Sequence, residues 1–164
     1  MNFERYTPRG LEAMDANGPR LLFAEHHREL ERACKALLAR AYEGDCHSLL
    51  DQYRPFEQHV LEHMRAEEEA VLPYFEKEHA QEAAEIRAAH EKLRRRLEST
   101  ACDLELHSAR IDNLRELVTE LRQHAAEEDR VMYPWAQVHL PVPALRASWE
   151  RLMASLRHLI RLGT

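Results

Sequence analysis

The chain has few residues that interrupt helices and no long apolar run. Its 164 residues include only four glycines and seven prolines, and no segment alternates apolar and polar residues as a half-buried strand does. No apolar run approaches the roughly 18 residues needed to span a bilayer. The first residues also lack the apolar core of a signal peptide. We therefore predict a cytoplasmic protein without a membrane-spanning helix.

The chain also lacks an excess of positive charge and a cysteine framework. The net charge is -6, with acidic and basic residues interspersed, which leaves no basic surface for nucleic acid or for an anionic membrane. The three cysteines, Cys34, Cys46 and Cys102, are odd in number and have no zinc-knuckle spacing. We interpret them as free thiols in a reducing compartment.

Apolar residues recur instead at three- and four-residue intervals along nearly the whole chain, which predicts an all-α protein of one domain. The periodic segments predict an antiparallel up-down-up-down four-helix bundle over residues 19–135, preceded by an irregular arm over 1–18. The predicted helices run from Pro19 to Gly44, from Asp45 to Pro73, from about Glu78 to Cys102 and from about Ser108 to Tyr133. We expect Pro55 to kink the second helix or to split off its first turn.

A fifth helix is predicted over residues 144–162, after the rigid linker Leu140-Pro141-Val142-Pro143. Its apolar stripe has to cover either the open end of the bundle or a second copy of the chain in a homodimer.

Two segments repeat one pattern of potential metal ligands. His63 and Glu67, and again His124 and Glu128, form H-x-x-x-E, and a proline follows each Glu by six residues. In a helix, residues four apart project from the same face, so each pair presents one imidazole and one carboxylate in the same direction. Such mixed N and O donors suit iron, manganese or zinc.

The two halves of the chain are related by an internal repeat. The second H-x-x-x-E lies 124 − 63 = 61 positions after the first, and His90-Glu91-Lys92-Leu93 lies 90 − 27 = 63 positions after His27-Arg28-Glu29-Leu30. His27 has apolar or sulfur residues at +3 and +7, as His90 does, so we favour His27 over its neighbour His26 as the inward histidine. His26 remains the alternative.

A bundle of these helices would bring six inward donors together, namely His27, His63, Glu67, His90, His124 and Glu128. This set exceeds the needs of one tetrahedral zinc, and two carboxylates able to bridge predict a pair of metals about 3.5–4 Å apart. His59, four residues before His63, is a candidate fifth imidazole or a supporting partner. We interpret the acidic neighbours Glu68, Glu69, Glu127 and Asp129 as part of the solvated face.

At these residues the chain resembles the hemerythrin-like family of HHE cation-binding domains. The resemblance covers roughly Pro19 to Trp135 and includes both H-x-x-x-E segments with their trailing Leu-Pro and Tyr-Pro. It implies a non-haem di-iron centre in which Glu67 and Glu128 bridge two iron ions, joined by an oxo or hydroxo group. The four histidines His27, His63, His90 and His124 are then the terminal ligands. Manganese and zinc suit the same donors.

The chain departs from the oxygen-carrying hemerythrins at two places. Arg94 stands where they have a second histidine one turn after that of the third helix, and H-x-x-x-E stands where they have H-x-x-x-x-D. Either His59 supplies the fifth imidazole or the site keeps an additional open position.

Three classes of function remain open at this stage, of which the third is a structural bundle whose fifth helix drives dimerisation. The first is a binding protein whose di-iron centre binds or senses O2 or NO, or holds iron. The second is a di-iron enzyme that reduces peroxide or NO, oxidises ferrous iron, or delivers iron for the repair of damaged iron centres. Turnover would require a redox partner protein, because the chain contains no electron source of its own.

Overall fold

The protein is helical throughout the part that can be described. The computed structural model describes residues 18–44, 46–106, 108 and 110–140, and within these ranges there are six helices and no strand. The helices are α2 (Gly18–Glu43), α3 (Cys46–Ala70), α4 (Leu72–Phe75), α5 (Ala80–Glu105), α6 (Ile111–Arg130) and α7 (Met132–His139). The predicted all-α class is therefore confirmed.

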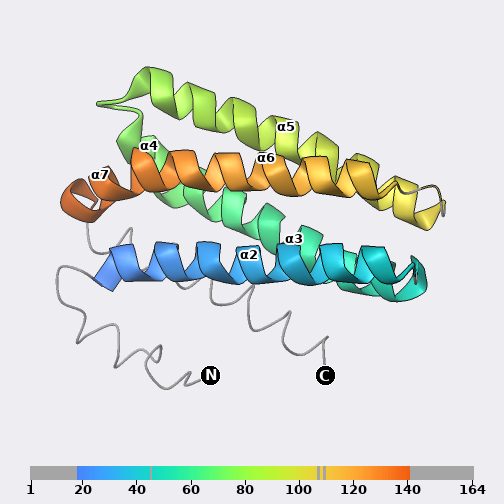
Figure 1. Ribbon diagram of the computed structural model, residues 1–164. Helices are drawn as coiled ribbons and strands as arrows, with labels where there is room; N and C mark the ends of the chain where they lie inside the picture. The colour runs from blue at the N-terminus through green and yellow to red at the C-terminus, as the bar shows by residue number, and fades with distance from the viewer. Residues whose placement is uncertain (1–17, 45, 107, 109, 141–164) are drawn as a thin grey trace.

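The four long helices α2, α3, α5 and α6 pack side by side in a bundle (Figure 1). Helix α2 packs mainly on α3 and α6, and α5 packs on the same two helices from the other side. The short helices α4 and α7 contact each other near one end of the bundle. Each long helix thus turns one stripe of side chains toward the interior, where inward histidines and carboxylates can meet.

Local sequence explains where these helices end. Gly44 follows α2 with φ 76°, a left-handed conformation that glycine adopts without steric cost and that commonly terminates a helix. Helices α3 and α6 both end at the single non-helical residues Val71 and Val131, two and three residues before a proline. A proline in a helix removes the hydrogen bond to the carbonyl four residues earlier and clashes with that carbonyl, which favours a break in the turn before Pro73 and before Pro134. The sequence therefore predicts these ends to within a few residues.

Two expectations about proline differ from the structure. Helix α3 continues through Pro55 without splitting, because one missing N–H removes a single bond from a 25-residue helix packed on two neighbours. The segments after Pro73 and Pro134 are also more helical than expected. Pro73 lies in the first turn of α4, where its missing N–H costs nothing, and α7 extends past Pro134 to His139.

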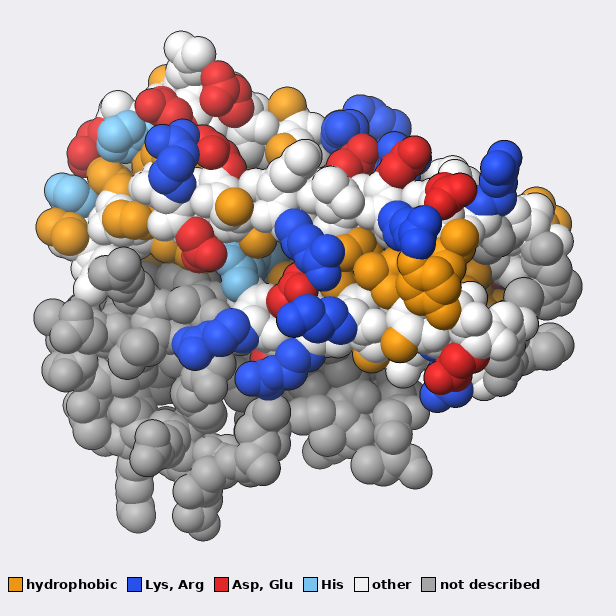
Figure 2. Space-filling model, viewed as in Figure 1, with side chains coloured by type: hydrophobic (Ala, Val, Ile, Leu, Met, Phe, Trp, Pro, Cys, Tyr) orange, Lys and Arg blue, Asp and Glu red, His pale blue; other side chains and the backbone are white. Residues whose placement is uncertain are grey.

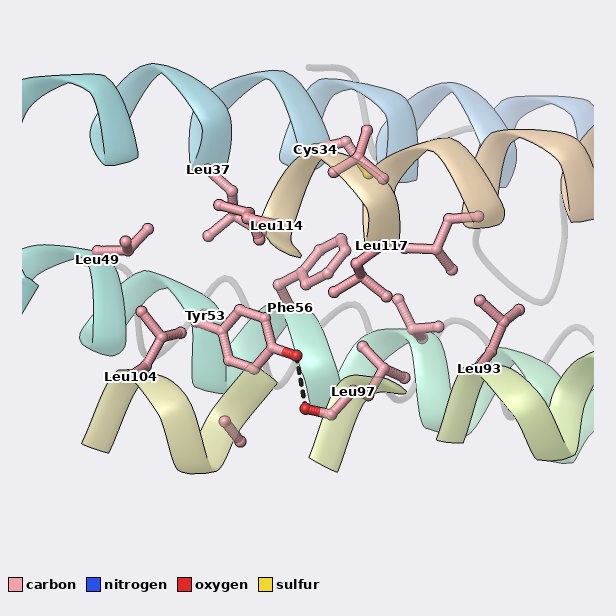
Figure 3. Packing of buried hydrophobic residues seen from close by; sticks show 14 of the residues in the cluster. Cys34, Leu37, Leu49, Tyr53, Phe56, Leu93, Leu97, Leu104, Leu114 and Leu117 are labelled. Carbon is pink, nitrogen blue, oxygen red and sulfur yellow. Dashed lines mark hydrogen bonds between the residues drawn. The ribbon is translucent and has the colours of Figure 1, made fainter. Parts of the chain in front are cut away.

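The interior contains two apolar clusters. The larger one joins the four long helices, and Figure 3 shows part of it, including the buried Tyr53 hydroxyl, which donates a hydrogen bond of 2.8 Å to the Leu97 carbonyl. The smaller one joins α4 and α7 to neighbouring turns of the long helices, with Phe75 and Met132 fully buried. The candidate ligands come from the turns between these clusters, so apolar side chains enclose the site along the bundle axis.

Several expectations fall on residues outside the described ranges. These are most of the N-terminal arm, almost all of the proline linker, the fifth helix over 144–162 and the homodimer that it would form. Of the described cysteines, Cys34 is buried and Cys102 exposed, and both are free thiols. Among the described helices, none combines the length and the apolar character that crossing a bilayer requires.

Candidate metal centre

Six predicted ligands converge in the middle of the bundle, each long helix contributing at least one. His27 lies on α2, His63 and Glu67 on α3, His90 on α5, and His124 and Glu128 on α6. Both glutamates and His90 have no solvent exposure, and His27 is only 9% exposed. Burying carboxylates and imidazoles at this depth is costly unless a counter-charge or a metal compensates them.

The donor atoms form two groups. The first, which we call position one, contains His27, His63, Glu67 and Glu128, and the second, position two, contains His90, His124 and the same two glutamates. Within each group the ligand atoms all lie within 4.8 Å of one another. Both glutamates therefore belong to both positions.

Each shared glutamate turns one oxygen to each position. Glu67 places Oε1 3.4 Å from His63 Nε2 and Oε2 3.5 Å from His90 Nε2. Glu128 places Oε2 3.3 Å from His27 Nε2 and Oε1 2.9 Å from His124 Nε2. This division of oxygens is the arrangement in which a carboxylate can bridge two metal ions.

The donor set fits a pair of transition-metal ions. Within the described part of the chain, the buried atoms Glu67 Oε2, Glu128 Oε2 and His124 Nε2 accept or donate no hydrogen bond of acceptable geometry. Buried polar atoms are nearly always satisfied in native proteins, so such orphaned atoms call for a partner such as an ion. Imidazole and carboxylate donors together suit iron, manganese and zinc.

A carboxylate outside the donor groups orients His90. The Nδ1 atom of His90 donates a hydrogen bond of 2.9 Å to Glu68 Oε1, which leaves Nε2 directed at position two. The other oxygen of Glu68 accepts a hydrogen bond of 2.7 Å from Arg94. Arg94 is thus held by this carboxylate and does not replace the missing histidine as a donor. Glu68, which was expected on the solvated face, instead lies half-buried beside the site.

The second half of the chain repeats this device. His27 Nδ1 donates to Asp129 Oδ1 at 3.2 Å, and Asp129 follows Glu128 just as Glu68 follows Glu67. Glu69 and Glu127 are exposed, as predicted. The sequence signal that could have identified the orienting residues is therefore the acidic residue directly after each glutamate of the two H-x-x-x-E segments, which the repeat carries in both halves.

The shared carboxylates alter the proton affinity of the histidines. Burial lowers the pKa of His27, but Asp129, Glu128 and Glu67 outweigh it and raise that pKa to about 10. Burial likewise opposes protonation of His90, and the carboxylates of Glu128 and Glu67 raise its pKa to about 10. Burial also raises the pKa of Glu128, yet its histidine neighbours, led by His124, hold that pKa well below the usual value. Without metal, protons on the imidazoles therefore balance the buried carboxylates.

His59 lies outside both donor groups. Its side chain is 3% exposed, one helical turn before His63, and burial followed by the nearby charge of His63 lowers its pKa to about 3. Its imidazole is therefore neutral. Of the neighbours His26 and His27, His27 is the one in a donor group, whereas the side chain of His26 is outside the described set.

Tyr133, which sequence analysis did not single out, reaches position one from α7. Its side chain is buried, and its hydroxyl donates a hydrogen bond to Glu67 Oε1 and lies 3.2 Å from His27 Nε2. Burial and the charges of Glu67 and Glu128 raise the pKa of Tyr133 well above the ordinary value. The tyrosine was concealed because it appeared only as the residue before Pro134.

A pocket of about 210 Å³ adjoins position one between α2, α3 and α6. Its walls are mainly apolar, and its lining includes both histidines of position one together with His124 and Glu128. Arg122 and Glu31 also line the pocket, and Arg122 donates two hydrogen bonds of 2.8 Å to Glu31. Figure 2 shows histidine atoms in the groove between α6 and α2, beside basic and acidic side chains. A small uncharged ligand would fit such a space.

Replacing Glu68 by glutamine is expected to weaken metal binding at position two. The amide cannot accept from His90 and pair with Arg94 as the carboxylate does, so the imidazole loses its fixed orientation. Loss of such an outer partner typically costs about 10–100-fold in metal affinity. Titration with Zn²⁺ against a competing chelator would measure the change. Glu69→Gln, one residue away and paired with Arg65 on the surface, is the matched control, and equal affinities of the two variants would contradict the orienting role.

A helical bundle with a buried set of histidines and shared carboxylates defines a class of metal-binding proteins. The family within this class follows from comparison with known families. The model of the Hemerythrin HHE cation binding domain matches residues 20–136, and it matches again over residues 83–162. Because the first match alone spans more than half of the chain, the chain belongs to this family.

The offset between the two matches equals that of the internal repeat. The second match begins 83 − 20 = 63 residues after the first, which is the offset between His27 and His90. Comparison with curated proteins and with solved structures gave no match.

Proposed function

We propose that the chain holds a non-haem di-iron centre that binds or senses O2 or NO, or stores iron. The observation that carries this proposal is the pair of shared glutamates, each with one oxygen at either position. The proposed ligands are His27 and His63 at position one, His90 and His124 at position two, and Glu67 and Glu128 between them. We also propose that the four long helices run antiparallel, since the connections between consecutive ones are short.

The residues of this chain would serve a small ligand in three ways. The imidazoles and carboxylates hold the metals, Glu68 and Asp129 orient two of the imidazoles, and the apolar pocket beside position one admits a small uncharged molecule. When bound, iron supplies reversible binding of a diatomic ligand. The apolar clusters on both sides limit access of water and protons to the site.

Metal analysis tests this proposal directly. Protein purified without added metal is expected to contain two iron ions per chain. His63→Ala is expected to lose the ion at position one, because that position loses one of its two imidazoles. Elemental analysis gives the metal content per chain of both proteins. The control should be an exposed residue, and the neighbouring Met64 is unsuitable because it is fully buried. The exposed His139→Ala is the suitable one.

One zinc per chain, or no metal, unchanged in His63→Ala, would contradict the di-iron proposal. If two irons are found, mixing the reduced protein with O2 separates the functional classes. A stable and reversible visible band supports ligand binding, whereas rapid bleaching with consumption of peroxide supports turnover.

A further inference from the structure

The two halves of the internal repeat differ at Tyr133, whose hydroxyl contacts donors of position one. Tyr133 lies 133 − 72 = 61 residues after Leu72, so the two residues occupy equivalent places before Pro134 and Pro73. Both side chains are buried, but Leu72 is apolar and packs in the smaller cluster around α4 and α7. A hydroxyl is therefore present on one side of the pseudo-symmetric site and has no equivalent at the repeat-related residue.

The hydroxyl of Tyr133 is closely associated with two donors of position one. It donates to Glu67 Oε1 and lies 3.2 Å from His27 Nε2, and the Tyr133 ring lies 5.1 Å from the His27 ring between centroids. These two donors come from α3 and α2, whereas Tyr133 comes from α7. The third element thus closes position one from a direction that neither histidine helix occupies.

The distances from His27 Nε2 to three neighbouring polar atoms are those expected between donors around one ion. With metal–ligand bonds of about 2.0–2.2 Å, neighbouring donors in octahedral or tetrahedral geometry lie roughly 2.8–3.6 Å apart. His27 Nε2 lies 3.3 Å from His63 Nε2 and 3.3 Å from Glu128 Oε2. The distance of 3.2 Å from His27 Nε2 to the Tyr133 hydroxyl falls in the same range. The phenol oxygen is therefore placed as a further donor of this set.

We propose that Tyr133 is a protein ligand of the metal at position one, bound through its deprotonated phenol oxygen. The inference rests on the proposed di-iron function and deepens it. On binding, the O–H bond of the phenol breaks, the proton passes to the solvent and the oxygen lone pair forms the bond to the metal, with no change of oxidation state. Position one then has one protein donor more than position two, which makes the two metals chemically unequal.

The test compares the iron-loaded wild-type protein with Tyr133→Phe. Ferric iron bound by a tyrosine oxygen gives a visible charge-transfer band and enhanced phenolate ring vibrations in resonance Raman spectra. We expect these signals in the wild type and their complete loss in Tyr133→Phe. The half-exposed Tyr74→Phe is the matched control and should keep them. Iron per chain and circular dichroism are measured on the same samples. Tyr133→Leu, which copies the residue at the equivalent place in the first repeat, serves if the phenylalanine variant does not fold.

The possible results separate this inference from the proposed function. Two irons in a wild-type protein without phenolate vibrations would overturn the role of Tyr133 and leave the di-iron function standing. Phenolate vibrations that persist in Tyr133→Phe or Tyr133→Leu would overturn it as well. A wild-type protein that binds no iron would overturn both.

Discussion

Glu128→Gln is expected to weaken metal binding strongly at both positions. Glu128 is fully buried and places one carboxylate oxygen at each position, so a single substitution removes a donor from both. A glutamine side chain keeps the size of the residue but has only one acceptor oxygen and no charge. By comparison, His90→Ala removes a donor from position two alone.

Removing a direct donor should cost more metal affinity than removing a residue that only orients a ligand, for which the loss is about 10–100-fold. We therefore expect the affinity at each position to fall by more than about 100-fold. Metal analysis after dialysis, together with chelator competition, measures the loss. Glu127→Gln is the matched control because Glu127 is the preceding residue, exposed and paired with Arg130. It should keep the wild-type metal content.

The variant also tests the balance of charge in the metal-free protein. Removing the Glu128 charge leaves the protonated His27 and His90 with one carboxylate fewer, and breaking a buried ion pair commonly costs about 3–5 kcal/mol. Thermal unfolding of the metal-free variant should therefore begin at a lower temperature than that of the wild type. If Glu128→Gln retains both metals and the wild-type stability, the shared carboxylate arrangement is wrong.

The position of the six candidate ligands could be predicted because helical periodicity relates sequence spacing to direction. His63 and Glu67 lie one turn apart on an apolar stripe, and the repeat adds the equivalent pair on α6. The structure brings all six together, while metal binding by them stays a prediction. Periodicity could not reveal Glu68 or Asp129, since a residue 100° off the stripe still reaches an imidazole on an adjacent helix.

Tyr133 could not be predicted for a different reason. Its place at the site depends on α7, and that helix follows a residue, Val131, at which the regular pattern of α6 stops. Periodicity carries no information across such a break, because the direction of the next helix is set by packing. Here α7 packs on α2 and α4, and this packing places the Tyr133 side chain inside the bundle, against Glu67 and His27.

Metal affinity is expected to rise steeply with pH through the neutral range. In the metal-free protein the pKa values of His27 and His90 are both raised to about 10 by nearby carboxylates, which outweigh the opposing effect of burial. Metal binds only the deprotonated imidazole, so a proton must leave each position before its metal can bind. As the pH rises toward 10, release of the imidazole proton alone raises the metal affinity about tenfold per pH unit at each position, or about 100-fold between pH 7 and pH 9. At position one the proton that Tyr133 releases on binding adds to this dependence.

The stability of the metal-free protein should change in the opposite sense. A raised pKa means that the folded state binds the proton more tightly than the unfolded chain does. The stabilisation by His27 and His90 is therefore complete below the unfolded pKa of about 6.5 and is lost as the pH rises toward 10. The increase in melting temperature on adding metal should consequently grow from pH 7 to pH 9.

Chelator competition with Zn²⁺ at several pH values, paired with thermal unfolding with and without metal, measures both trends. Asp129→Asn is the informative variant, since it removes one carboxylate that raises the pKa of His27. It should flatten the pH dependence at position one and leave that of position two as in the wild type. A wild-type affinity that does not change between pH 7 and pH 9 would mean that the two histidines are already neutral there. The buried carboxylates would then have to be balanced by something other than protons on these imidazoles.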